Sequence, residues 1–305
     1  MLYFNLKSKL RTSVSSKALT VVRSPGFKEN FILTGTLLAL AGCGGGGGGS
    51  SGTSGTTNTQ TPVETILTGN VVKGPLNNAL VFADYNGDGI LSPNEPNTRT
   101  GADGAFSLTS TNPSAGFVSI ADSLTTDAFT GEKVDGLIMK APSGSSVVTP
   151  ITTLMVELNE ENPNIQISEI ATALGLSGVD LKTFNPFGEN VNSSTALIAE
   201  KVAAQIVAAA SSVAQSAKGA GAASSIAYEK AFESIAVAIK AEINDGNSSD
   251  SIDLADGQVL STIKNAAVDK LGGQVSSQTS FETVLTTAMS ATENVNKKIE
   301  TINNL

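Results

Sequence analysis

The sequence predicts an α+β protein of two domains, a small antiparallel β-sandwich followed by an all-α helical bundle. Between residues 62 and 148, short segments rich in β-branched and aromatic residues alternate with clusters of Gly, Pro, Asn and Asp, which is typical of strands joined by tight turns. From residue 149 onward, apolar residues recur every three or four positions, the period of an amphipathic helix. Aromatic residues make up only 5% of the 305 residues and Trp is absent, so Ala, Val, Ile and Leu must supply most of the packing.

Residues 1–42 have the pattern of a secretory signal peptide. They hold six Lys or Arg and one acidic residue, Glu29, and they end in the apolar run FILTGTLLALAG at residues 31–42. That run is too short to span a bilayer permanently but suits the apolar core of a signal peptide. The single cysteine, Cys43, follows directly, so the chain has no intramolecular disulfide and no thiolate zinc cluster.

The tetrapeptide Leu40-Ala41-Gly42-Cys43 resembles the lipobox of bacterial lipoproteins. The resemblance implies cleavage before Cys43 and attachment of acyl chains such as palmitate to its sulfur and its new amino group. Several acyl chains on one residue anchor a protein far more firmly than one. The next residue is Gly44 and not Asp, which by resemblance to lipoproteins of Gram-negative bacteria implies the outer membrane, on either face. The alternative is an incidental buried cysteine.

Residues 43–61 are expected to be the lipidated cysteine and a tether. The stretch GGGGGGSSGTSGTTNTQT at residues 44–61 has no apolar and no charged side chain. Such a coil spans roughly 20–25 Å by the square-root rule for flexible linkers.

Without residues 1–42 the chain keeps 13 basic and 27 acidic residues, a net charge of -14. That charge disfavours nucleic acid and anionic lipid headgroups and favours cations.

The β domain is expected over residues 62–148. Asp103 and Gly104 have the composition of a tight turn before the third strand. The predicted strands lie within LTGNVVKG (67–74), NALVFADY (78–85), GAFSLTS (104–110), GFVSIAD (116–122) and VDGLIMKA (134–141).

The stretch DYNGDGILSPNE at residues 84–95 has the spacing of a calcium loop. Oxygen-bearing side chains stand at loop positions 1, 3, 5, 9 and 12, a glycine (Gly89) at position 6 permits the sharp turn, and position 7 offers its backbone carbonyl. Ca²⁺ is a hard cation that prefers six to eight oxygen ligands. The candidate ligands are Asp84, Asn86, Asp88, Ile90, Ser92 and Glu95.

The flanks of this loop differ from those of a helix-loop-helix. A predicted strand enters it, and Pro93 and Pro96 disfavour a helix after it. The loop therefore resembles those of calcium-binding β-sandwich repeats in bacterial surface proteins, with a later turn matched by Thr100, Asp103, Gly104 and Phe106. The resemblance covers about residues 66–155 and implies a structural Ca²⁺. The alternative is an acidic turn that binds nothing.

Two other acidic stretches are weaker candidates. Asp122, Asp127 and Glu132 could bind a second cation or complete the first site, although a solvated loop is the simpler interpretation. The run DGNSSDSIDLAD at residues 245–256 has the composition of a solvated linker.

The helical domain is expected over residues 149–305. Thr149 has the position of an N-cap and Pro150 that of a first helical residue. The apolar faces are Ala-rich and lack the Lys/Arg-rich polar side of helices that lie on membranes, so we predict a packed bundle. Helices are expected within residues 148–158, 168–176, 194–217, 224–243, 256–271 and 280–302. One face of the third should carry Ile198, Val202, Ile206, Ala209 and Val213.

The composition excludes several classes of catalytic and binding site. The sequence has no His, which excludes His-based catalytic triads, His general bases and His metal ligands. It has no Gly-x-Ser-x-Gly motif and no phosphate-binding Gly-rich loop. We therefore expect a non-enzymatic, lipid-anchored envelope or surface protein with a calcium-stiffened β module and an extracellular or envelope protein partner. The alternatives are an envelope glycan-acting enzyme, or a helical partner-docking lipoprotein without calcium.

Overall fold

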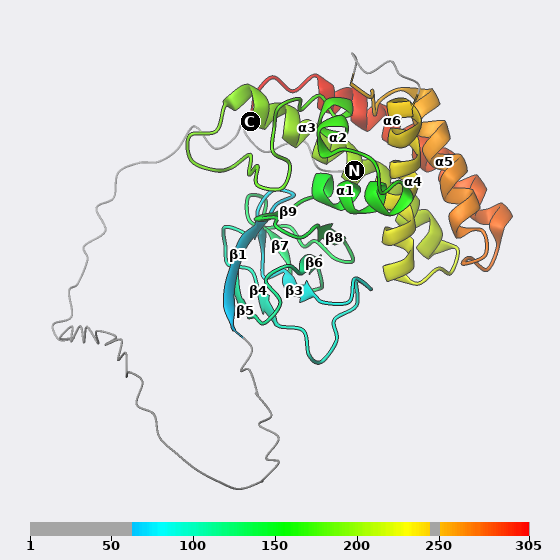
Figure 1. The fold of residues 1–305 in the computed structure, drawn as a ribbon. Helices are drawn as coiled ribbons and strands as arrows, with labels where there is room; N and C mark the ends of the chain where they lie inside the picture. Colours follow the sequence, from blue (N-terminus) through cyan, green and yellow to red (C-terminus); the bar gives the residue numbers. More distant parts are fainter. Residues whose placement is uncertain (1–62, 245–250, 305) are drawn as a thin grey trace, which may run out of the picture. The chain divides into compact units, whose positions relative to one another are not determined.

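The computed structural model describes residues 63–244 and 251–304, and the predicted signal peptide, Cys43 and the whole tether lie outside these ranges. The order of elements is mixed α+β, with strands up to residue 148 and helices from residue 150 (Figure 1). The strands are β1 (Thr65–Val71), β2 (Leu76–Asn77), β3 (Leu80–Asp84), β4 (Asn97–Arg99), β5 (Ala105–Ser110), β6 (Gly116–Ile120), β7 (Thr126–Asp127), β8 (Ile138–Ala141) and β9 (Val147–Val148).

These strands form three small sheets, in the orders β5-β1-β9, β2-β7 and β4-β3-β6-β8. The pairs are antiparallel, for example Thr65 with Ser110 and Leu80 with Ile120, except that β9 runs parallel to β1. The five predicted strands are confirmed as β1, β3, β5, β6 and β8. The short strands β2, β4, β7 and β9 are too brief to give a periodic sequence signal.

The first and the largest sheet meet through aromatic side chains. Phe106 of β5 and Phe117 of β6 are both buried, with ring centroids 5.1 Å apart in an edge-to-face arrangement. Gly104 precedes β5 with φ +77°, and its backbone N–H donates to the carbonyl of Gly101. The expected tight turn at residues 103–104 is therefore present. A residue with a side chain would be strained there, since a Cβ on Gly104 would lie 2.5 Å from the carbonyl oxygen of Val71.

The helices are α1 (Pro150–Glu161), α2 (Ile167–Ala173), α3 (Ser193–Gly219), α4 (Ser224–Asn244), α5 (Gly257–Leu271) and α6 (Gln278–Glu300). The predicted start of α1 is confirmed: Pro150 is its first residue, and the Thr149 hydroxyl accepts a hydrogen bond from the Thr152 N–H. The Asp256 carboxylate caps α5 in the same way, by accepting from the N–H groups of Gln258 and Val259.

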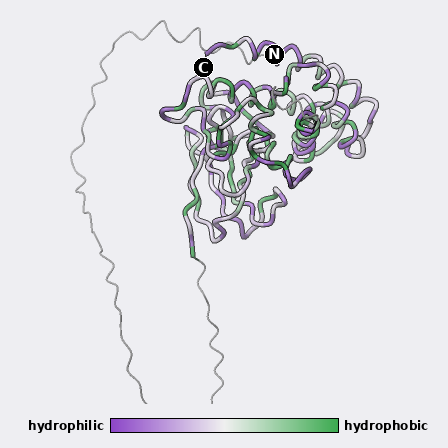
Figure 2. Tube along the Cα trace, turned by 45° about the horizontal axis from the view of Figure 1, so that its top comes forward, coloured by the Kyte–Doolittle hydropathy of each residue, from purple (hydrophilic) through white to green (hydrophobic). Residues whose placement is uncertain are grey.

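The long helix α3 packs against α4 and α6. Hydrophobic and hydrophilic residues are interspersed along the described chain (Figure 2). The predicted apolar face is confirmed at Ile206, Ala209 and Val213, which are buried completely. It is wrong at Ile198, whose side chain is 41% exposed. The first turns of α3 bury the small residues Ala196 and Ala199 instead, because a neighbouring element can approach closely only over small side chains.

Strands and helices share a hydrophobic core. The buried cluster runs from Val71 and Met139 in the strands to Leu154 in α1 and Phe232 in α4, and residues 62–305 make one compact unit. A hydrogen bond also joins α1 to β8, because the Thr152 hydroxyl donates to the Lys140 carbonyl at 2.8 Å. The boundary expected between residues 148 and 149 thus marks a change of secondary structure, while the core continues across it.

Candidate metal centre

The predicted calcium loop is the long connection of the β3–β4 hairpin. Its first residue, Asp84, is the last of β3, and β4 begins at Asn97 two residues after Glu95. The N–H of Ala83 donates to the carbonyl of Pro96 at 3.1 Å, which closes the hairpin at the base of the loop. Strands therefore flank the loop on both sides: the entering strand and the absence of a helix after the loop were predicted, and β4 was not.

Asp84 fixes the first half of the loop. Its Oδ1 accepts from the Gly87 N–H at 2.7 Å and its Oδ2 from the Gly89 N–H at 2.9 Å. Both glycines adopt positive φ, +77° at Gly87 and +70° at Gly89, which lets the chain turn around the carboxylate. The glycine at position 6 thus has the conformational role that the spacing predicts.

The middle of the loop is exposed, and it is held by local contacts. The Asp88 Oδ1 accepts from the Ile90 N–H at 2.7 Å, and its Oδ2 accepts from the Asn86 side-chain amide at 2.8 Å. In this arrangement Asn86 turns its nitrogen toward Asp88. Coordination of one cation by both residues would require the Asn86 amide to rotate, because only its oxygen can be a ligand.

Glu95 ties the two ends of the loop together. Its side chain is buried, with 4% of the residue exposed. One carboxylate oxygen accepts from the Tyr85 N–H at 2.8 Å and the other from the Ser92 N–H at 2.7 Å. Hydrogen bonds to a charged acceptor are the stronger kind, so Glu95 stabilises the loop before any ion is considered.

The donor set fits Ca²⁺ in kind. The candidate ligands are all oxygens, and a carboxylate that accepts one N–H at each oxygen still has lone pairs free. Among the residues described, no ion pair joins Asp84, Asp88 or Glu95 to Lys or Arg. Within the same residues, no three acidic side chains are gathered as they would be around one ion. In this structure the carboxylates accept hydrogen bonds from backbone N–H groups of the loop and so hold its conformation.

The second acidic stretch is divided between separate partners. Asp122 pairs with Arg99 at 2.5 Å, and this guanidinium holds the pKa of the carboxyl below its usual range. Asp127 lies 3.9 Å from Lys73 and accepts from the N–H groups of Phe129 and Thr130. These contacts give both carboxylates structural roles.

The sequence reasoning did not single out two further carboxylates, the buried Glu157 and the half-buried Glu200. Glu157 of α1 is 1% exposed and lies 3.0 Å from the Lys140 ammonium. Burial raises its pKa to about 7, although Lys140 opposes the shift. Its place between Leu154 and Leu158 on the buried side of α1 was the available signal. Burial likewise raises the pKa of Glu200 in α3 to about 7, with the positive charge of Lys73 opposing the shift.

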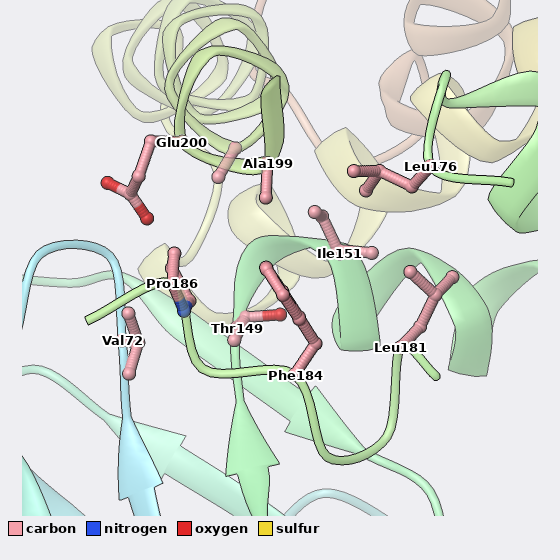
Figure 3. Close-up of a pocket in the computed structure, with 10 residues that line it drawn as sticks. Val72, Thr149, Ile151, Leu176, Leu181, Phe184, Pro186, Ala199 and Glu200 are labelled. Carbon is pink, nitrogen blue, oxygen red and sulfur yellow. The ribbon is translucent and has the colours of Figure 1, made fainter. Parts of the chain in front are cut away.

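Glu200 borders a small cavity between α3, the start of α1 and the 176–186 segment. Figure 3 shows its carboxylate at the edge of the cavity, apart from the apolar side chains of Ile151, Leu181 and Phe184. The cavity measures about 20 Å³, room for about one water molecule. It is a packing defect beside a half-buried acid and is too small for a substrate.

One helix of the described ranges, α3, is long and apolar enough to cross a membrane by length and composition. Half of its most apolar window is buried against the rest of the protein, as in the core helix of a bundle.

Comparisons with protein-family models, curated protein sequences and solved structures found no significant match. The functional argument therefore depends on the chain's own residues.

Proposed function

We propose that the protein is a lipid-anchored component of a bacterial envelope whose hairpin loop at residues 84–95 binds a structural Ca²⁺. On this proposal Cys43 carries the acyl chains in the outer membrane, and residues 44–61 tether a sandwich-like β module followed by the helices. The role is binding or organisation, and not catalysis. The partner is an extracellular or envelope protein.

The observation that carries the calcium proposal is the conformation of the β3–β4 connection. Asp84 and Glu95 lie at opposite ends of the loop in sequence, and each already gathers two backbone N–H groups around a carboxylate. The loop is thereby held at both ends, and Ca²⁺ binding would require the Asn86 amide to rotate and the carboxylates to turn toward one ion. The side-chain oxygens of Asn86 and Ser92, the Asp88 carboxylate and the Ile90 carbonyl would complete six or more ligands.

Calcium would neutralise three carboxylates that lie within twelve residues of sequence. Bringing these carboxylates to one point without a cation would be unfavourable, because like charges repel. The loop has no flanking helix pair to open, so a stabilising role fits better than a sensor role. Extracellular modules of this kind bind calcium with dissociation constants of about 10⁻⁴–10⁻³ M.

Calorimetric titration of Ca²⁺ into the chelator-treated full chain tests the metal. We expect saturation near one ion per chain, and a higher melting temperature in calcium because the ion binds only the folded loop. Mg²⁺ is the control, since it demands a tighter octahedral site. Absence of both heat and thermal shift would show that residues 84–95 form an acidic turn.

Membrane fractionation of the Cys43→Ser variant tests the anchor separately. The variant should leave the membrane fraction of the producing bacterium, while the unaltered chain stays there and takes up labelled palmitate. Retention of Cys43→Ser in the membrane would refute the lipobox assignment without affecting the calcium result.

A further inference from the structure

We propose that the cleft between the largest sheet and helices α1 and α2 binds a short apolar peptide with a free amino and a free carboxyl terminus. The cleft has a volume of about 390 Å³, within the range of ~300–1,000 Å³ that is usual for ligand pockets. Its walls come from the calcium-loop hairpin, β6, β8 and the two helices. It is separate from the cavity beside Glu200.

The floor of this cleft is apolar. Phe117 of β6, Met155 of α1 and Ile170 of α2 line it, and each of them is at least 95% buried. Ile165 lies on the same surface, and Ile167 at the start of α2 leaves 39% of its area exposed. A large apolar side chain exposed beside an apolar floor favours a ligand with apolar side chains of its own.

Two of the four charged side chains that line the cleft already have partners. The Lys140 ammonium lies 3.0 Å from the buried Glu157 carboxylate. The Asp84 carboxylate accepts from the N–H groups of Gly87 and Gly89. Lys140 is therefore committed to Glu157, whereas Asp84 keeps its negative charge but has a backbone N–H bound at each carboxylate oxygen.

The other two, Lys182 and Glu160, are the groups that can recognise the ends of a peptide. In residues 63–244 and 251–304, neither takes part in an ion pair. The Lys182 Nζ donates to the Ser143 carbonyl at 2.9 Å, which holds the ammonium at the cleft and leaves two of its three donors for a ligand carboxylate. Glu160 offers a carboxylate to a ligand ammonium.

This combination selects the class of ligand. One free positive and one free negative group complement a zwitterion, and the apolar floor complements apolar side chains between the two charges. Asn159, which also lines the cleft, can bond to a peptide group in both directions. A fatty acid would use Lys182 and the floor but would leave Glu160 without a partner. The volume suits about two to three residues.

The test is calorimetric titration of the full chain, in chelator, with leucyl-leucine and its blocked forms. We expect saturable binding of one peptide per chain, weakened about tenfold by N-acetylation and about tenfold by C-amidation, because each removes one charge-assisted contact. Decanoate is the comparison ligand for the fatty-acid alternative. The chelator removes calcium, so this result does not depend on the metal site.

Variants locate the binding. Lys182→Gln should lose the preference for the free carboxyl terminus and keep the preference for the free amino terminus, and Glu160→Gln should do the reverse. Lys264→Gln, in helix α5 and not among the residues that line the cleft, is the matched control and should bind like the unaltered chain. Ile167→Ser should weaken every peptide without changing the melting temperature by more than Val284→Ser, which alters a similarly exposed residue of α6.

Four results would overturn the proposal. The first is no binding of leucyl-leucine. The second is equal affinity for the free and the doubly blocked peptide, and the third is tighter binding of decanoate than of the peptide. Loss of binding in Lys264→Gln together with Lys182→Gln would equally overturn it, because the effect would then be one of overall charge.

Discussion

Replacement of Glu95 by Ala should destabilise the protein even when calcium is absent. The carboxylate is buried and accepts one backbone N–H at each oxygen, from Tyr85 and from Ser92. A hydrogen bond to a charged group contributes about 1.5–3 kcal/mol, and water can reach part of the opened loop. We therefore expect the unfolding free energy to fall by about 2–4 kcal/mol in chelator.

Asp88→Ala is the matched comparison. Asp88 is exposed and bonds only within the loop, to the Ile90 N–H and the Asn86 amide. Its loss in chelator should be about 0.5–1 kcal/mol. In calcium at about a hundred times the dissociation constant, the unaltered chain gains about 2.7 kcal/mol, and both variants should forfeit most of that gain.

The assay is urea unfolding of the full chain at equilibrium, with the denaturant slope compared between variants. A loss below about 1 kcal/mol for Glu95→Ala in chelator would refute the inference that its oxygens hold the ends of the loop. An Asp88→Ala loss that is the same with and without calcium would instead refute the metal proposal and leave the hairpin argument intact.

Three further predictions concern the fold. Because burial raises the pKa of Glu157 from 4.5 to about 7, the folded chain binds a proton that the unfolded chain has released, so stability should fall as pH rises through this window. Glu157→Gln should remove about 3 kcal/mol of that fall in urea unfolding at pH 4.5 and 8, while Glu200 keeps a fall of the same sign. Gly104→Ala should lower the unfolding free energy by at least ~2 kcal/mol, because a Cβ would meet a β1 carbonyl oxygen at 2.5 Å. Gly144→Ala, with a similar φ of +78° but open space, should lose only ~1 kcal/mol, and a larger loss there would contradict the steric argument. Asp256→Ala should lose ~1 kcal/mol through the α5 cap, and unchanged stability would show that water replaces it.

The sequence by itself determined the features that depend on neighbouring residues. Thr149 and Pro150 start α1 because a cap and a first helical residue need only the next turn of backbone. The loop at residues 84–95, entered by a strand and not followed by a helix, was predictable because Gly89, Pro93 and the residues of β3 each act locally.

Only the tertiary structure decided what those local features contact. The parallel pairing of β9 with β1 joins residues more than seventy positions apart, and two residues of strand carry no periodic signal. The exposure of Ile198 depended on which face of α3 its neighbours cover. In the candidate site, the spacing predicts a set of oxygen ligands and this stays a prediction, whereas the backbone amides that Glu95 accepts from depended on how the hairpin closes.

The cleft has the same origin. Lys140, Glu160 and Lys182 belong to a strand, a helix end and a loop, and no spacing in the sequence relates them. They meet because the largest sheet packs against α1 and α2 in one core, which also buries Glu157 behind Lys140. Local geometry is encoded within a few residues, whereas burial and long-range pairing follow from the packing of the whole chain.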